Sequence, residues 1–180
     1  MQHNFFYKKI GSLEYNILFD LQNTITKIEY VPEPDFPDDV LTVSKNTSKI
    51  EYFNYRKLEI QVIRYLLQFF NISGHISTNV AKQAPMSYLH EHSDYGTIYT
   101  NRQKIDDTIK LQIPIITNPG VGMMWAQSAT DWECVHFEES GIYIIDNVRR
   151  HSIVNLGSTD RYYLTSKWKL DSIIDKSLLT

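Results

Sequence analysis

The sequence predicts an α+β protein that is mainly β, with its helices confined to the N-terminal part. Eight short segments between residues 76 and 169 have the length and composition of strands, and turn residues separate them. The aromatic content agrees, because Tyr, Phe and Trp favour extended structure and the chain holds 12, 8 and 3 of them. Short strands at close spacing are typical of a β-sandwich or a β-barrel.

Two helical signals in the N-terminal part lie on either side of a loop. Residues 13–21 have the composition of a short helix. Residues 32–39 hold three of the six prolines and four acidic residues, which is typical of a loop. Residues 56–70 carry apolar side chains at i, i+3 and i+4, so they predict an amphipathic helix that Asn71 and Gly74 would end.

The β core is predicted from eight segments that alternate with turns. The segments are 76–83, 87–92, 108–116, 121–126, 133–138, 141–145, 150–156 and 161–169. Glycine and proline residues such as Pro119, Gly120 and Gly157 mark the gaps between them. The single cysteine, Cys134, excludes an internal disulfide and a cysteine-based zinc cluster, and we expect its side chain to be a small buried apolar group.

Length and charge limit the class of protein. The 180 residues fit a single domain over 1–180, in which residues 1–74 form a helical and mixed support and residues 75–170 form the β core. The formal net charge is −3 and no run of Lys or Arg exceeds two residues, which argues against a nucleic-acid partner. No apolar segment approaches the ~20 residues of a membrane span and no signal peptide is visible, so we expect a cytoplasmic protein without a membrane partner.

Segment 108–116 has one apolar and one polar face. Side chains alternate across a strand, so the four aliphatic residues at odd-numbered positions point one way and Lys110 and Gln112 point the other. The polar face fits two interpretations. It faces water, which the segment alone favours, or it lines an active-site cavity.

The histidines of the β core include a metal-ligand pattern. His92 and Asp94 form a His-x-Asp, and residues i and i+2 of an extended segment share a face about 6.5–7 Å apart, so both can reach one metal ion. His151 follows His92 by 59 residues, and Arg161 follows His151 by ten. Two histidines and one carboxylate form the facial triad of non-haem Fe(II) oxygenases.

The residue types in this pattern suit oxygenase chemistry. Three protein ligands leave three positions on an octahedral iron for a bidentate 2-oxo acid and for O2. The distal carboxylate of the 2-oxo acid needs a fixed cation, and Arg161 can supply it because a guanidinium binds a carboxylate through two parallel hydrogen bonds. Two neighbouring strands can bring residues 151 and 161 together.

Further segments of the β core match a known family. They are Ala84-Pro85-Met86, His92-Ser93-Asp94, TIKLQIPI at 108–115, Glu139-Ser140-Gly141, Asp146-Asn147, and His151 and Asn155 leading to Asp160-Arg161. In these segments the chain resembles the aspartyl/asparaginyl β-hydroxylase family of Fe(II)/2-oxoglutarate-dependent oxygenases, which includes proline-hydroxylase-like members. The resemblance implies a double-stranded β-helix, a jelly-roll and cupin-like fold, with supporting N-terminal helices.

The resemblance also implies a function. It makes His92, Asp94 and His151 the catalytic iron ligands and Arg161 the residue that binds 2-oxoglutarate. The implied enzyme is a hydroxylase that uses Fe(II), 2-oxoglutarate and O2 on an amino-acid or peptidyl side chain, so its partner is a small-molecule or peptide substrate. The oligomeric state does not follow from the sequence.

One strand departs from the family pattern. Members commonly have Arg-x-His where this chain has Lys110-Leu111-Gln112. Lys110 and Gln112 can still donate hydrogen bonds to 2-oxoglutarate, but they are not equivalent to Arg and His. The resemblance therefore predicts that the polar face of segment 108–116 points inward and helps to bind the cosubstrate with altered geometry.

Two other interpretations stay open. A cupin-type metalloenzyme would use His90, His92 and His151 as ligands and would need no 2-oxo acid. A non-catalytic β-sandwich binding module would carry its histidines by coincidence and bind no metal. Substitution of Asp94 separates the oxygenase from the cupin enzyme, because only the oxygenase uses this carboxylate as a ligand.

Overall fold

The computed structural model of the chain describes residues 6–27, 31–32, 50–53, 62–93 and 108–179. Three sequence-based predictions therefore fall partly or wholly outside the described residues. They concern the acidic loop after Pro32, the first part of the predicted helix 56–70, and Asp94.

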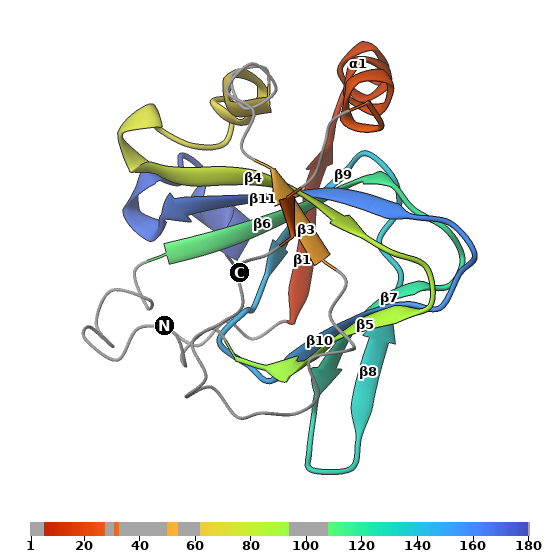
Figure 1. Cartoon of the computed structure of the whole chain (residues 1–180). Coiled ribbons are helices and arrows are strands. Elements are labelled where there is room, and N and C mark those ends of the chain that lie inside the picture. The colour runs from red at the N-terminus through yellow and green to blue at the C-terminus, as the bar shows by residue number, and fades with distance from the viewer. Residues whose placement is uncertain (1–5, 28–30, 33–49, 54–61, 94–107, 180) are drawn as a thin grey trace.

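The described strands form two antiparallel sheets (Figure 1). The large sheet has the order β1-β9-β6-β11-β4-β3-β2, and the small sheet has the order β5-β10-β7-β8. The strands are β1 (Tyr7–Ser12), β2 (Val31–Pro32), β3 (Ile50–Phe53), β4 (His75–Gln83), β5 (Ser87–His92), β6 (Thr108–Ile116), β7 (Val121–Ala126), β8 (Trp132–Val135), β9 (Gly141–Ile145), β10 (His151–Asn155) and β11 (Arg161–Lys169). The helices are α1 (Tyr15–Ile25), the 3-10 helices η1 (Ile72–Gly74), η4 (Leu170–Ser172) and η5 (Lys176–Leu179), and a helical segment at 62–66.

From β4 to β11 the chain alternates between the two sheets, except that β7 and β8 form a hairpin within the small sheet. β4, β6, β9 and β11 belong to the large sheet, whereas β5, β7, β8 and β10 belong to the small sheet. This winding is a double-stranded β-helix of the jelly-roll type, which confirms the predicted fold class. The eight strands predicted for the β core are present as β4 to β11, with bounds that differ by at most three residues.

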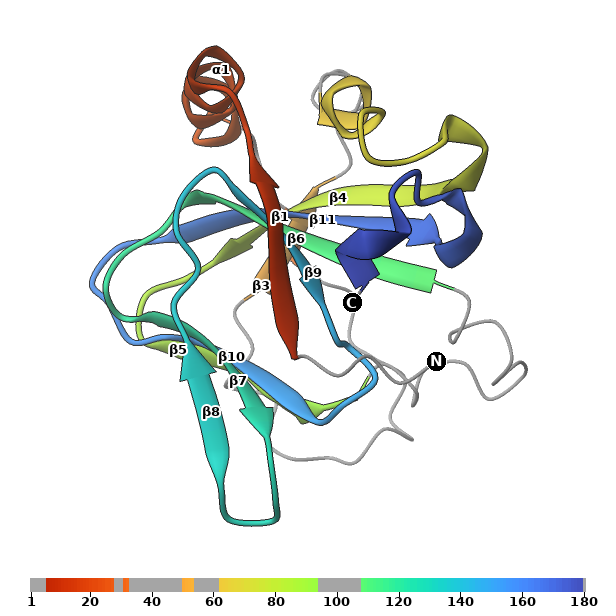
Figure 2. The same ribbon diagram turned by 180° about the vertical axis from the view of Figure 1, so that it is seen from behind.

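Helices cover the outer face of the large sheet (Figure 1, Figure 2). The odd-numbered aliphatic side chains of β6 pack there against Leu21 and Ile25 of α1 and against Val62 and Leu66 of the segment 62–66. Each helical pair is four residues apart and so lies on one helix face. Burial of each aliphatic side chain contributes roughly 1.5–3 kcal/mol, so this core fixes the N-terminal part on the sheet.

The inner face of the large sheet packs against the small sheet through a second core rich in aromatic residues. This core consists of Met123, Trp125, Phe137, Tyr143, Ile145 and Ile153. Gln112 lies on the inner face, opposite the aliphatic side chains of β6, and is 1% exposed. The water-facing interpretation is therefore wrong for Gln112, because β9 and β11 flank β6 on both sides and the neighbouring core closes over it.

The N-terminal strand β1 was not predicted from the sequence. It pairs with β9 at the edge of the large sheet. Its first residue, Tyr7, and the preceding Phe6 place their rings 5.7 and 6.1 Å from that of Trp125. The N-terminus therefore completes the second core.

Two further findings concern the exposure of Cys134 and the search for a helix that could span a membrane. Cys134 is exposed, so the expectation of a buried side chain is wrong; it lies on β8, which is the edge strand of the small sheet. Within the described part of the chain, no helix is both long and apolar enough to cross a membrane.

Candidate metal and cosubstrate site

Two of the predicted iron ligands lie side by side in the small sheet. His92 is the last residue of β5 and His151 is the first residue of β10, and they are direct partners in the antiparallel pair. Their ring centroids are 4.3 Å apart with an angle of 52° between the ring planes. The structure thus brings together two residues that are 59 positions apart in the chain.

A β-bulge sets the position of His92. His92 pairs with His151 while Leu89 pairs with Ile153, so three steps along β5 match two steps along β10. Ser152 stabilises this irregular pairing, because its hydroxyl donates to the Leu89 carbonyl at 2.7 Å. The extra residue turns the end of β5, so that its terminal histidine meets the first histidine of β10.

Backbone hydrogen bonds orient both imidazole rings in the same way. His92 Nδ1 lies 2.7 Å from the His90 carbonyl oxygen, and His151 Nδ1 lies 2.8 Å from the Arg149 carbonyl oxygen. A carbonyl oxygen only accepts, so each Nδ1 is the donor. The neutral rings therefore carry their lone pair on Nε2, which is the atom that a histidine ligand presents to a metal when Nδ1 is bonded to a backbone carbonyl.

The turn before His151 is held by Asp146. This buried carboxylate accepts hydrogen bonds from the backbone N–H groups of Val148 and Arg149 at 3.1 and 3.3 Å and from Arg149 Nε at 2.9 Å. Trp125 is the cross-strand partner of His151, and its indole N–H donates to the Asp146 carbonyl at 2.8 Å. These contacts fix the Arg149 carbonyl that orients His151.

The other two candidate ligands are His90 and Asp94. The ring of His90 packs edge-on against Tyr88, with centroids 4.9 Å apart. Asp94, the predicted carboxylate ligand, lies outside the described residues. Among the described residues alone, no group of three His, Cys, Asp or Glu side chains is arranged to hold a metal ion.

The predicted carboxylate-binding residue, Arg161, is the first residue of β11 and is only 1% exposed. Its Nη1 donates to the Gln83 Oε1 at 3.2 Å. Its guanidinium carbon lies 4.1 Å from the centroid of the Tyr163 ring. A buried guanidinium held against a ring is fixed in orientation, which suits recognition of a planar anion.

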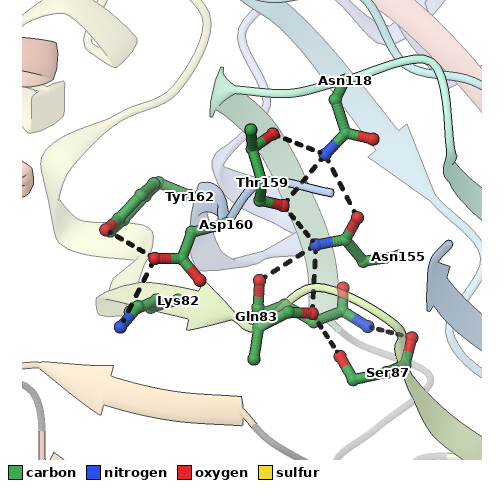
Figure 3. A network of polar contacts seen from close by, with 9 residues as sticks. Lys82, Gln83, Ser87, Asn118, Asn155, Thr159, Asp160 and Tyr162 are labelled. Carbon is green, nitrogen blue, oxygen red and sulfur yellow. Dashed lines mark hydrogen bonds and ion pairs between the residues drawn. The ribbon is translucent and has the colours of Figure 1, made fainter. Parts of the chain in front are cut away.

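A hydrogen-bond network centres on Asn155 and includes Gln83, the hydrogen-bond acceptor of Arg161 (Figure 3). Asn155 is fully buried, and its Nδ2 lies 3.1 Å from the Gln83 and Ala84 carbonyl oxygens and 2.9 Å from that of Thr159. Its Oδ1 accepts from Asn118 Nδ2 at 3.1 Å. Asn155 therefore ties the turn between β4 and β5 to the turn between β10 and β11.

Sequence reasoning did not identify Gln83 as part of the site. Its only signal was a polar residue at the end of a predicted strand. In the structure Gln83 is fully buried and is the cross-strand partner of Arg161.

The polar residues of β6, Lys110 and Gln112, lie on the inner face of the large sheet. Gln112 is opposite Thr165 of β11 and Tyr143 of β9, and its buried Nε2 has no hydrogen-bond acceptor among the described residues. A buried donor without an acceptor is costly unless a ligand or water satisfies it. Lys110 is half-buried on the same face, opposite Lys167.

Tyr143 contributes a neutral hydroxyl to the same inner face. Burial raises the pKa of this phenol above its usual range, although the hydrogen bond from the Glu138 N–H acts in the other direction. The phenol therefore stays protonated at neutral pH. Tyr143 is the cross-strand partner of Gln112 and stacks on Phe137, with ring centroids 4.2 Å apart.

Comparisons with known proteins show the fold. No family model matches the sequence, and no curated protein matches it. HygX from Streptomyces hygroscopicus, solved with nickel and 2-oxoglutarate bound, superposes with a TM-score of 0.63 at 8% identity, over 91% of this chain and 82% of that chain.

Two further solved structures superpose equally well. A prolyl hydroxylase from Trichoplax adhaerens, in complex with a hypoxia inducible factor peptide fragment, has a TM-score of 0.64 at 11% identity, over 92% of this chain and 84% of that chain. The epimerase SnoN from nogalamycin biosynthesis, which is α-ketoglutarate dependent, has a TM-score of 0.64 at 10% identity, over 91% and 78%. The chain thus shares its overall fold with these three solved structures.

Proposed function

We propose that the protein is an Fe(II)- and 2-oxoglutarate-dependent oxygenase. The observation that carries the proposal is the pairing of His92 with His151, with both rings oriented by Nδ1 hydrogen bonds to backbone carbonyls. The pair lies in a double-stranded β-helix that also buries Arg161. Histidine pairs oriented in this way suit a divalent metal.

The iron would be held by His92 and His151 through Nε2 and by the Asp94 carboxylate. Asp94 follows His92 by two residues, a spacing that suits two ligands of one ion. Bound Fe(II) with this ligand set supplies oxidative chemistry and leaves coordination positions for a 2-oxo acid and O2. The protein provides the orientation of the rings and a site shielded from water.

The cosubstrate would be anchored on the inner face of the large sheet. Arg161 would bind the distal carboxylate of 2-oxoglutarate, because its guanidinium is buried, charged and fixed against Tyr163. Gln112 has a buried Nε2 donor that fits a carboxylate oxygen, and Lys110 adds a positive charge two residues away on the same face.

The substrate proposed is an amino-acid or peptidyl side chain, and the reaction is its hydroxylation. Support comes from the resemblance of residues 75–170 to the aspartyl/asparaginyl β-hydroxylase family. The prolyl hydroxylase that shares the fold was solved with a peptide fragment, and HygX was also solved with hygromycin B. An epimerase shares the fold as well, so the reaction has to be established by product analysis.

An anaerobic titration tests the proposal. Fe(II) and 2-oxoglutarate are added to the metal-free protein, and the visible spectrum is recorded. We expect a weak metal-to-ligand charge-transfer band that requires both components, because both would occupy one site. Bound iron without the band would contradict 2-oxoglutarate dependence, and absence of iron binding would leave the binding-module interpretation.

Substitution of the carboxylate ligand separates the oxygenase from a cupin-type enzyme. In the oxygenase, Asp94→Ala removes an iron ligand and His90→Ala leaves the iron in place. In a cupin-type enzyme that uses His90, His92 and His151, the two substitutions have the opposite effects. Iron content after dialysis against a weak chelator measures the difference directly.

A further inference from the structure

We propose that Gln83 is a positioning residue that sets both the orientation and the available charge of Arg161, and thereby selects 2-oxo acids that carry a distal carboxylate. The inference rests on the proposed function, since it assigns a role within the same cosubstrate site. Gln83 is fully buried at the end of β4, directly opposite Arg161 in the β4–β11 pair.

Both ends of the Gln83 amide are engaged, which determines its orientation. Its Nε2 lies 3.4 Å from the Ser87 carbonyl oxygen and 3.3 Å from the Ile153 carbonyl oxygen. Carbonyl oxygens only accept, so the NH2 group must face them and Oε1 must face Arg161. The Arg161 Nη1 then donates to this Oε1 at 3.2 Å. The amide therefore acts as a fixed acceptor.

A neutral acceptor at this position has an electrostatic consequence. Gln83 accepts a hydrogen bond from the guanidinium without adding a negative charge beside it. A glutamate at the same position would form a charge-assisted pair with Arg161 and offset its attraction for a second carboxylate. The amide thus orients the guanidinium and keeps the field at the site positive.

The backbone of Gln83 is held as firmly as its side chain (Figure 3). Asn155 donates to the Gln83 carbonyl and to the adjoining Ala84 carbonyl, both at 3.1 Å. Through its own side chain Gln83 contacts Ser87 of β5, Ile153 of β10 and Arg161 of β11. One amide therefore connects the strand that bears Arg161 with the two strands that bear His92 and His151.

The central variant is Gln83→Glu, which keeps the shape of the side chain, adds a negative charge beside Arg161 and removes the NH2 donor to the Ser87 and Ile153 carbonyls. We expect it to raise the Kd of 2-oxoglutarate by roughly tenfold or more, the scale of a hydrogen bond to a charged group. Gln83→Met removes the acceptor without adding charge and should raise the Kd by a smaller factor. Gln83→Met also keeps the test decisive if Gln83→Glu does not fold.

The measurement compares two 2-oxo acids of equal chain length on the Fe(II)-loaded protein under anaerobic conditions. 2-Oxoglutarate carries the distal carboxylate, whereas 2-oxopentanoate lacks it. If Gln83 acts through Arg161, Gln83→Glu weakens binding of 2-oxoglutarate and leaves binding of 2-oxopentanoate unchanged. The preference for the dicarboxylic acid then falls by the same factor of about ten.

Ser87→Ala is the matched control, because it removes a buried hydrogen bond from the same turn without touching Arg161. The Ser87 hydroxyl donates to the Ala84 carbonyl at 2.6 Å. We expect Ser87→Ala to lower the melting temperature and to keep the preference between the two acids. The melting temperature of each variant shows how far a loss of stability contributes to its change in Kd.

Two outcomes would overturn the inference. Unchanged binding of 2-oxoglutarate by Gln83→Glu would show that the amide does not govern Arg161. An equal loss of affinity for both acids in the Gln83 variants would show a purely structural role. A wild-type protein that binds iron and neither acid would instead contradict the proposed function itself, so the two failures are distinguishable.

Discussion

His92 and His151 are direct cross-strand partners, and each ring donates from Nδ1 to the carbonyl two residues before it in the chain. The same local geometry thus occurs at the end of one strand and at the beginning of its neighbour. It selects the same tautomer in both rings and presents two Nε2 atoms from adjacent strands. This arrangement is the observation on which the proposed metal site rests.

Replacement of either histidine should weaken metal binding strongly. We expect His92→Ala and His151→Ala to reduce the affinity for Fe(II) by at least about 100-fold and to abolish turnover, because each removes one ligand. Anaerobic calorimetric titration with Fe(II) gives the affinity. His136→Ala is the control, because His136 also bonds a backbone carbonyl, that of Val121, through Nδ1 at 2.9 Å but is exposed. Tight Fe(II) binding by His151→Ala would remove this residue from the site.

Arg161 should govern the requirement for 2-oxoglutarate rather than for iron. Arg161→Gln removes the charge and keeps hydrogen-bonding groups, so we expect the half-saturating concentration of 2-oxoglutarate to rise by about 10- to 100-fold, the scale of a hydrogen bond to a charged group. Fe(II) affinity, measured without 2-oxoglutarate, should change little. An unchanged 2-oxoglutarate requirement in a folded variant would exclude Arg161 from the cosubstrate site.

Asp146 should act on the metal site through the turn that it holds. Its carboxylate accepts three hydrogen bonds from Val148 and Arg149, and the Arg149 carbonyl orients His151. We expect Asp146→Ala to weaken Fe(II) binding by roughly 10- to 100-fold, the range seen for outer partners of metal ligands.

Asp175 offers the control for that experiment. Its carboxylate also accepts from a nearby backbone N–H, that of Ser177 at 2.9 Å, but it lies on the exposed C-terminal segment. Asp175→Ala should leave Fe(II) affinity unchanged. Equal Fe(II) affinity in Asp146→Ala and Asp175→Ala would refute the role assigned to Asp146.

Asn155 should contribute mainly to stability. Asn155→Ala removes the donor of the Gln83 carbonyl, whereas the Ala84 and Thr159 carbonyls keep a second donor in Ser87 and Asn118, and we expect a loss of about 1–3 kcal/mol in the free energy of unfolding. Asn23→Ala is the control, since its amide donates to the Phe19 carbonyl on the exposed surface of α1 and should cost less than about 0.5 kcal/mol. Urea denaturation measures both, and equal losses would contradict the importance of burial here.

The strands of the β core were predictable because their pattern is local. β6 shows this best, since alternation of aliphatic and polar residues defined both the strand and its two faces. The alternation alone did not decide whether the polar face met water, because that depends on the sheet that packs against it, and only the family resemblance predicted that this face points inward. β1 was missed for a related reason: a six-residue edge strand with two lysines acquires its identity from pairing with β9.

The candidate site also contains residues that the sequence indicated and residues that only the structure revealed. The spacing of His92, His151 and Arg161 was a sequence signal, and the structure places the two histidines together and buries the arginine. Gln83 and Asn155 gave no comparable signal, because their hydrogen bonds join residues about 70 to 80 positions apart. Side-chain amides of this kind acquire a role only from the geometry of distant strands.

The sequence by itself determined the mainly β class, the positions of eight strands and the two histidines that meet, because strand periodicity and residue spacing are properties of neighbouring positions. The tertiary structure alone decided that Gln112 is buried, that the turn of Asp146 orients His151, and that a neutral amide faces Arg161. These features depend on which strands pair and on the small register shift between β5 and β10. A shift of one residue sends a side chain to the opposite face, so only the assembled sheets specify the site.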